Sequence, residues 1–130
     1  TDLADCIRSI CNLSGEDSKY KKNNIFNINS CKYFLEGYLS ISNIKNYSLS
    51  FLPEFVYLII FELTIRFVTD FLQSNKYFKI KYQTHNLFRA EAQYRFLSSF
   101  VKQSQGFSKV LDELEIFSRS TFITDVQKFV

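Results

Sequence analysis

Hydrophobic residues recur at helical spacing along most of this chain, separated by polar stretches. Each helix-like segment has one apolar face, and the segments span residues 2–13, 28–39, 51–72, 85–102, 110–117 and 122–129. Only Pro53 and three glycines interrupt the pattern, and Pro53 falls in the first turns of its segment, where a missing N–H costs little. The pattern therefore predicts an all-α fold.

One short stretch departs from helical spacing. Residues 76–82 mix polar and apolar side chains as a short extended segment would. A lone strand is unstable, so we expect this segment to lean on the helices at either side of it. The predicted architecture is all-α with one short extended segment near 76–82.

The segment 51–72 carries charge where an apolar helix should have none. Residues 55–61 are apolar all the way round, but Glu62, Arg66 and Asp70 then recur every four residues and fall on one stripe. One interpretation places this stripe at the edge of the core, facing a pocket or a partner, with the charges paired within the helix. The other is a solvated stripe on an ordinary amphipathic helix. Periodicity alone does not separate the two.

Composition narrows the class of protein. The length of 130 residues suits one domain. A net charge of +3, with only short basic runs, argues against a nucleic-acid partner. The longest apolar run is far shorter than the ~20 residues needed to cross a bilayer, so we expect no membrane partner. Three cysteines without a C-x-x-C pattern predict no disulfide framework and fit reduced thiols in a cytoplasmic protein.

Catalytic motifs are missing from the printed sequence. No glycine-rich phosphate loop is present. The only histidine, His85, offers no plausible catalytic triad and no strong zinc pattern. The neighbouring carboxylates at 2/5, 16/17 and 112/113/115 are best interpreted as a helix cap, a loop and a solvated face. We therefore assign no catalytic and no metal-binding residue.

Residues 66–90 carry the most specific pattern in the chain. They read R-F-V-T-D-F-L-Q-S-N-K-Y-F-K-I-K-Y-Q-T-H-N-L-F-R-A. This resembles R-F-L-x-D-Y-L-x-G-D-x-Y-F-x-x-K-Y-P-x-H-N-L-x-R-A in the C-terminal helical region of sugar kinases of the aminoglycoside phosphotransferase superfamily, the group that includes N-acetylhexosamine kinase. The likeness continues upstream, where it matches Asp2, Asp5, Ile7, Arg8, Asn12, Glu16, Asp17, Phe34, Gly37, Tyr38 and Leu39. It covers about residues 1–102, and 103–130 form a divergent helical tail.

The resemblance implies a fold, an activity and a site. It implies that residues 1–130 form a single helical domain, part of the C-terminal lobe of a protein-kinase-like fold. Complete family members use ATP and Mg²⁺ to phosphorylate the anomeric hydroxyl of a sugar, and none of these cofactors is assigned to this chain. By motif, the residues that contact the sugar are Arg66 and Tyr77. The flanking acids Glu62 and Asp70 would support the arginine.

Several positions depart from the family pattern. The glycine and acid that follow the long helix are Ser74 and Asn75 here, the proline is Gln83, and the arginine after R-A is Glu91. The nucleotide-binding lobe and the H-x-D-x-x-x-x-N loop of the family have no counterpart in the printed sequence. We therefore expect the acceptor-sugar-binding portion of a sugar kinase, inactive by itself. The departures leave the local geometry near the sugar open.

Alternatives remain at each level. The chain could instead be a freestanding helical interaction module that self-associates, or a part completed by a separate kinase N-terminal protein. Arg66 could serve only as an intrahelical ion pair, and Tyr77 only as a loop aromatic at the edge of the core. We expect His85 and Asn86 to cap the fourth helix. Arg8 could face the site or pair with Asp5, and we favour the pairing. Arg89 is expected to be structural and to tie the fourth helix to a neighbouring acid.

Overall fold

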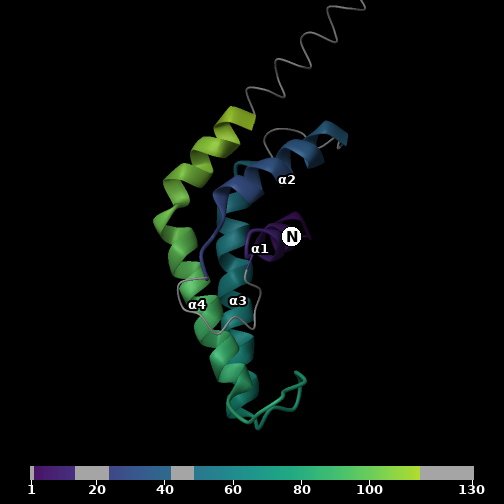
Figure 1. Ribbon diagram of the computed structural model, residues 1–130, viewed down its shortest axis with the longest axis vertical. Helices are drawn as coiled ribbons and strands as arrows, with labels where there is room; N and C mark the ends of the chain where they lie inside the picture. The colour runs from purple at the N-terminus through teal and green to yellow at the C-terminus, as the bar shows by residue number, and fades with distance from the viewer. Residues whose placement is uncertain (1, 14–23, 42–48, 115–130) are drawn as a thin grey trace, which may run out of the picture.

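Two long antiparallel helices organise the protein (Figure 1). The computed structural model describes residues 2–13, 24–41 and 49–114. The helices are α1 (Asp2–Ile10), α2 (Ile28–Ile41), α3 (Leu52–Leu72) and α4 (His85–Lys102), and residues 104–114 are also helical. The main packing contacts join α3 to α4, α1 to α3 and α1 to α2. The described residues confirm the all-α prediction; a kinase-like lobe remains a prediction.

The expected extended segment is not a strand. Residues 73–84 form an irregular loop of turns and bends between α3 and α4, at the lower end of the molecule in Figure 1. The part of the chain that the structure describes contains no β-strand, so residues 76–82 have no neighbouring strand with which to form hydrogen bonds. The loop is held instead by side chains from α3 and α4.

Helix boundaries follow the sequence pattern closely. The predicted segments 51–72 and 85–102 match α3 and α4 almost residue for residue, and Pro53 lies at the start of α3. The first helix ends at Ile10, earlier than expected. Asn27, just before α2, accepts a hydrogen bond through Oδ1 from the Ser30 N–H at 2.9 Å, an N-cap that the prediction did not include. Of the two predicted tail helices, residues 110–114 are helical, and 115–130 lie outside the described residues.

Phe26 fills the centre of the core from a segment that is not helical. Its ring lies 4.9 Å from Phe100, 5.7 Å from Phe107 and 5.8 Å from Phe96, measured between ring centroids. Its backbone is satisfied by side chains, since its N–H donates to Ser99 Oγ at 2.9 Å and its carbonyl accepts from Gln103 Nε2 at 2.8 Å. The segment before α2 is thereby attached to α4.

The apolar half of α3 is buried on one side only. Leu52, Val56 and Ile60 are buried, but Phe55, Leu58 and Phe61 on the same helix are each more than two-fifths exposed. An apolar helix is usually surrounded by protein. In α3, by contrast, the described residues leave part of the hydrophobic surface uncovered. None of the described helices is long and apolar enough to cross a membrane.

Replacing Phe26 tests the aromatic core. Phe26→Ala removes a fully buried ring and leaves a cavity, so we expect the free energy of unfolding to fall by about 3–5 kcal/mol. The measurement is urea denaturation followed by circular dichroism. The matched control is Tyr33→Ala, an aromatic that is 71% exposed on α2, for which we expect a change within about 0.5 kcal/mol. Equal losses in the two variants would contradict this account of the core.

Candidate functional site

A buried carboxylate joins the end of α3 to the loop that follows it. Asp70 is only 4% exposed. Its Oδ1 accepts a hydrogen bond from the Tyr77 N–H at 2.8 Å, and its Oδ2 accepts from the Phe78 N–H at 3.0 Å and from Asn86 Nδ2 at 2.7 Å. The one side chain therefore contacts both the loop and the first turn of α4.

The pKa of Asp70 is set by two opposing effects. Burial of the carboxyl on its own raises the pKa, because the charged form loses solvation. The hydrogen bonds from the N–H groups of Phe78 and Tyr77 and from the Asn86 amide outweigh that effect, and the pKa of Asp70 lies below its ordinary value of 3.8. The carboxylate is therefore charged at neutral pH, with the loop folded around it.

The first residues of the loop adopt a left-handed backbone. Ser74 has a φ of 67° and Asn75 a φ of 59°, a region that glycine enters freely and asparagine more readily than most residues. The Asn75 N–H donates to the Asp70 carbonyl at 2.7 Å. Its side chain then bridges the loop, since Nδ2 donates to the Gln83 carbonyl at 3.2 Å and Oδ1 accepts from Asn86 Nδ2 at 3.1 Å.

The remaining part of the loop is fixed from α4. Arg89 donates through Nη1 to the Lys79 carbonyl at 2.9 Å and to Asn86 Oδ1 at 3.1 Å, and its guanidinium lies 5.7 Å from the centre of the Phe67 ring. The Lys81 N–H donates to Nδ1 of His85 at 3.1 Å. Arg89 is thus structural, as expected, and in these contacts its partners are the oxygens of an amide and a backbone carbonyl.

The predicted capping roles of His85 and Asn86 are wrong. The N-cap position of α4 is Thr84, and it makes no side-chain cap. Both predicted residues lie buried in the first turn of the helix, and their side chains bind the preceding loop and Asp70. The sequence pattern placed them at the right end of the helix, but it contained no sign of the buried acid sixteen residues earlier that Asn86 contacts.

Arg66 lies at the surface beside Glu62. The Nε of Arg66 is 3.4 Å from Oε1 of Glu62, and the two side chains are 58% and 64% exposed. An exposed pair of this kind contributes little to stability, typically under about 1 kcal/mol. Asp70 does not share in this pairing. Arg66 and Asp70, which both lie in the described part of the chain, form no ion pair, because the Asp70 carboxylate is bound to the loop. Of the two acids expected to support the arginine, only Glu62 contacts it.

A pocket nevertheless brings Arg66 and Tyr77 together. It has a volume of about 290 Å³ between the C-terminal half of α3 and the loop, and it is lined by Ile65, Arg66, Thr69, Asp70, Gln73, Tyr77 and Phe78. Tyr77 is 76% exposed, and its ring rests edge-on against Phe78 at 4.9 Å. We call this hollow the Arg66 pocket.

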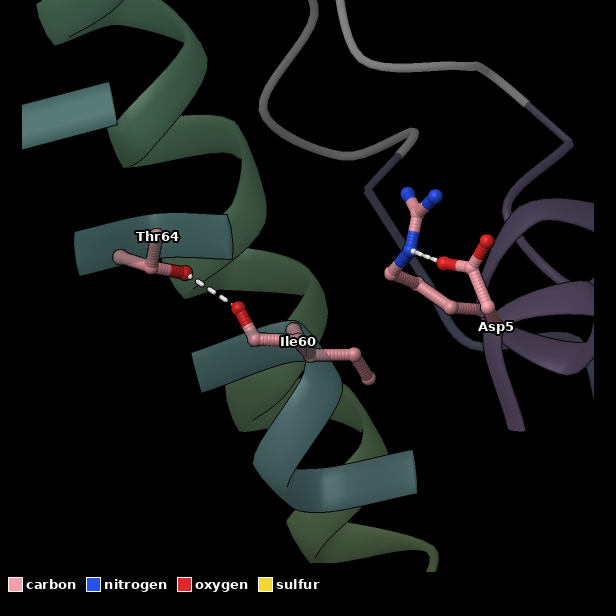
Figure 2. A network of polar contacts seen from close by, with 4 residues as sticks. Asp5, Ile60 and Thr64 are labelled. Carbon is pink, nitrogen blue, oxygen red and sulfur yellow. Dashed lines mark hydrogen bonds and ion pairs between the residues drawn. The ribbon is translucent and has the colours of Figure 1, made fainter. Parts of the chain in front are cut away.

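A second hollow adjoins the Arg66 pocket on the side of α1. Its volume is about 440 Å³, and it is lined by Asp2, Asp5, Arg8, Ile59, Glu62, Leu63 and Arg66. Arg66 therefore lines both hollows. Arg8 donates through Nε to Oδ1 of Asp5 at 2.9 Å (Figure 2), which confirms the expected pairing.

The side chains around the two hollows can donate and accept several hydrogen bonds. Arg66 supplies several N–H donors, Glu62 supplies acceptors, and Thr69 and Gln73 supply both. Tyr77 adds a flat aromatic face with a hydroxyl. Among residues 2–13, 24–41 and 49–114, no group of three or more His, Cys, Asp or Glu side chains could hold a metal ion. These groups can form hydrogen bonds with a polar ligand, including one rich in hydroxyl groups.

Sequence reasoning found some of this site and missed the rest. The four-residue spacing of 62, 66 and 70 placed these three residues on one stripe of α3. It missed that Asp70 turns inward, because the donors that stabilise the buried charge come from a loop with no regular pattern. It left open whether Arg8 would face this site, and the α1 residues Asp2, Asp5 and Arg8 do line a hollow that Arg66 also lines.

Comparison with known proteins adds no relative to this picture. No protein-family model matches the chain, and no curated protein matches it. The resemblance to sugar kinases therefore rests on the spaced residues of the sequence and remains a prediction.

The pH dependence of stability tests the contribution of the buried Asp70 carboxylate to the fold. Its pKa is lower in the folded state, so the charged carboxylate stabilises the fold above about pH 3.8, and this contribution is lost as the pH falls through the lower folded pKa. Asp70→Asn lacks that contribution. We expect its melting temperature to lie below that of the original protein at pH 7, and the difference to shrink steadily as the pH falls below about 4.

Thermal unfolding between pH 2 and pH 7 measures this difference. Glu62→Gln is the control, because Glu62 is exposed and its variant should follow the original protein at every pH. A difference between Asp70→Asn and the original protein that stays constant across the pH range would contradict the assignment.

Proposed function

We propose that this chain is the acceptor-sugar-binding portion of an ATP-dependent sugar phosphotransferase of the N-acetylhexosamine-like kind. The observation that carries the proposal is the presence of Arg66 and Tyr77 on the wall of one pocket, eleven residues apart in sequence. They are the two positions that the family resemblance implies as sugar contacts. Each has the chemistry for that task, a fork of donors in one case and an aromatic face in the other.

The loop geometry supports the same proposal. The family pattern has a glycine at the position of Ser74, and Ser74 has a φ of 67°, a conformation that glycine adopts without strain. Ser74 therefore has a backbone conformation that a glycine at this position would adopt readily, although the residue itself departs from the pattern. The neighbouring acid of the pattern is replaced by Asn75, whose amide makes hydrogen bonds to Gln83 and Asn86.

In this proposal the pocket orients the sugar rather than activating it. Arg66 donates to hydroxyl or carbonyl oxygens of the ligand, Tyr77 covers a ring face, and Thr69 and Gln73 complete the hydrogen bonds. ATP and Mg²⁺ would be bound by other parts of a complete kinase. Phosphoryl transfer requires all three to be held together, so these 130 residues alone would bind a sugar without phosphorylating it.

Binding of an N-acetylhexosamine tests the first part of the proposal. The pocket is open and lacks buried polar anchors beyond Asp70, so we expect weak binding, with a Kd on the order of 1 mM. Titration of the labelled protein with N-acetylglucosamine or N-acetylgalactosamine, followed by NMR, should shift the amide signals of residues 65–78. Arg66→Ala should weaken binding at least tenfold, and Arg66→Lys should weaken it less, because the charge remains but the fork is lost.

The control for this titration is Lys102→Ala, which removes an exposed cation at the far end of α4. Its affinity should equal that of the original protein. Absence of any shift with either sugar, for a folded sample, would remove sugar binding from the proposal.

An activity assay tests the second part. With ATP, Mg²⁺ and either N-acetylhexosamine, the isolated chain should form no sugar phosphate, because no residue in it is assigned to phosphate or metal binding. The assay measures sugar phosphate directly by mass spectrometry. Turnover above that of a heat-denatured sample would show that this chain contains a catalytic centre of its own.

A further inference from the structure

Two of the three cysteines lie buried against each other. Cys11 and Cys31 are fully buried in the hydrophobic core, and their thiols form a hydrogen bond with each other. Cys6, by contrast, is exposed. The Cys11 N–H donates to the Ile7 carbonyl at 3.0 Å and continues the turn of α1, so Cys6 and Cys11 point about 140° apart at 100° per residue. The exposed thiol is therefore not part of the buried pair.

The backbone holds the buried pair together through Asn27. The Asn27 N–H donates to the Cys11 carbonyl at 2.9 Å, and the Asn27 carbonyl accepts from the Cys31 N–H at 3.2 Å. The same residue caps α2 through its side chain, which accepts from the Ser30 N–H. One residue thus attaches the end of α1 to the first turn of α2. The contact between the two thiols follows from this backbone geometry, and two cysteines whose side chains already meet satisfy the first condition for a disulfide.

We propose that Cys11 and Cys31 form a site of reversible oxidation, at which a peroxide joins them in a disulfide that ties the end of α1 to α2. In the first step the Cys11 sulfur attacks hydrogen peroxide, the O–O bond breaks, and a sulfenic acid and one water form. In the second step the Cys31 sulfur attacks the Cys11 sulfur, the S–O bond breaks, and the Cys31 proton leaves with the hydroxyl as a second water. The two thiols lose two electrons, and one peroxide is reduced to two waters. This inference does not depend on sugar binding.

The order of the two steps follows from the positions of the thiols. Cys11 lies in the turn after α1, two residues before Leu13, which is 70% exposed. Helix ends open more readily than helix interiors, so an oxidant reaches Cys11 first. Cys31 lies within α2, and its hydrogen bond with Cys11 and its burial both raise the pKa of its thiol. A thiol held neutral in this way is suited to the second step, in which it meets a sulfenic acid already beside it.

The disulfide would restrain a wall of the second hollow. Asp2, Asp5 and Arg8 of α1 line the hollow that Arg66 also lines, and the link fastens the end of that helix to α2. A bond between residues 11 and 31 closes a loop of about 20 residues and removes conformational freedom from the unfolded chain. We therefore expect oxidation to raise the melting temperature by about 5–10 °C.

Peptide mapping of the full chain tests the pairing. Trypsin places the three cysteines on separate peptides, 1–8, 9–19 and 23–32. After the folded protein is treated with hydrogen peroxide and the remaining thiols are alkylated, mass spectrometry should find peptide 9–19 joined to peptide 23–32. Dithiothreitol should separate the two peptides again. The control is the same treatment in concentrated guanidinium chloride, where the unfolded chain should lose this preference and links to Cys6 should appear.

Two variants test the stabilisation and the order of the steps. Cys6→Ser should keep the link, and its oxidised form should melt about 5–10 °C above its reduced form. Cys31→Ala should stop at the sulfenic acid of Cys11, which dimedone labels on peptide 9–19, with circular dichroism to check that the variant is folded. The map of the original protein needs neither variant.

Three results would overturn the proposal. The first is that peptides 9–19 and 23–32 stay unlinked in the peroxide-treated folded protein. The second is a link from Cys6 in place of the expected one. The third is an oxidised Cys6→Ser protein that melts no higher than its reduced form, because the disulfide would then not match the native contact between α1 and α2.

Discussion

The geometry of the Arg66 pocket depends on one buried carboxylate, that of Asp70. A charge removed from water must be compensated by hydrogen bonds, and Asp70 meets that requirement with two backbone N–H groups of the loop and the amide of Asn86. Those bonds fix Tyr77 and Phe78 next to α3. Without them, Tyr77 and Phe78 would lose the backbone hydrogen bonds that hold them against α3, although Arg89 and His85 would still bind the later part of the loop.

The same carboxylate links α3 to α4. Asn86 bonds to Asp70 and Asn75 through Nδ2 and accepts from Arg89 through Oδ1, so one amide joins the end of one helix, the loop and the first turn of the next. Buried polar networks of this kind favour a single arrangement, because each alternative leaves a group without a partner. The apolar core formed by Phe26, Phe96 and Phe100 lies further along α4 and stabilises the helix pair without defining the loop.

Sequence patterns predicted what depends on local periodicity and missed what depends on distant partners. The spacing of apolar residues gave α3 and α4 nearly to the residue, since each has a continuous face buried against neighbouring helices. The four-residue spacing of Glu62, Arg66 and Asp70 placed all three on one stripe, but the three side chains differ in their exposure to solvent. Glu62 and Arg66 are exposed, whereas Asp70 is buried by a loop whose own sequence suggested a strand. The alternation in residues 76–82 was a weak signal, because a strand also needs a partner that no pattern supplied.

Each of the two interpretations of the charged stripe holds for a different part of α3. The pair formed by Glu62 and Arg66 is solvated, as an ordinary amphipathic helix would have it, and such a pair does not by itself require a ligand. One turn later, Asp70 is buried and positions Tyr77 so that a hollow forms between the aromatic ring and the guanidinium. An exposed Arg66 is thus compatible with a binding role. Its guanidinium is paired with Glu62 yet still reaches solvent, so it can exchange water for ligand oxygens at a low cost in free energy. The burial of Asp70, rather than that of Arg66, is the feature that makes this surface a pocket.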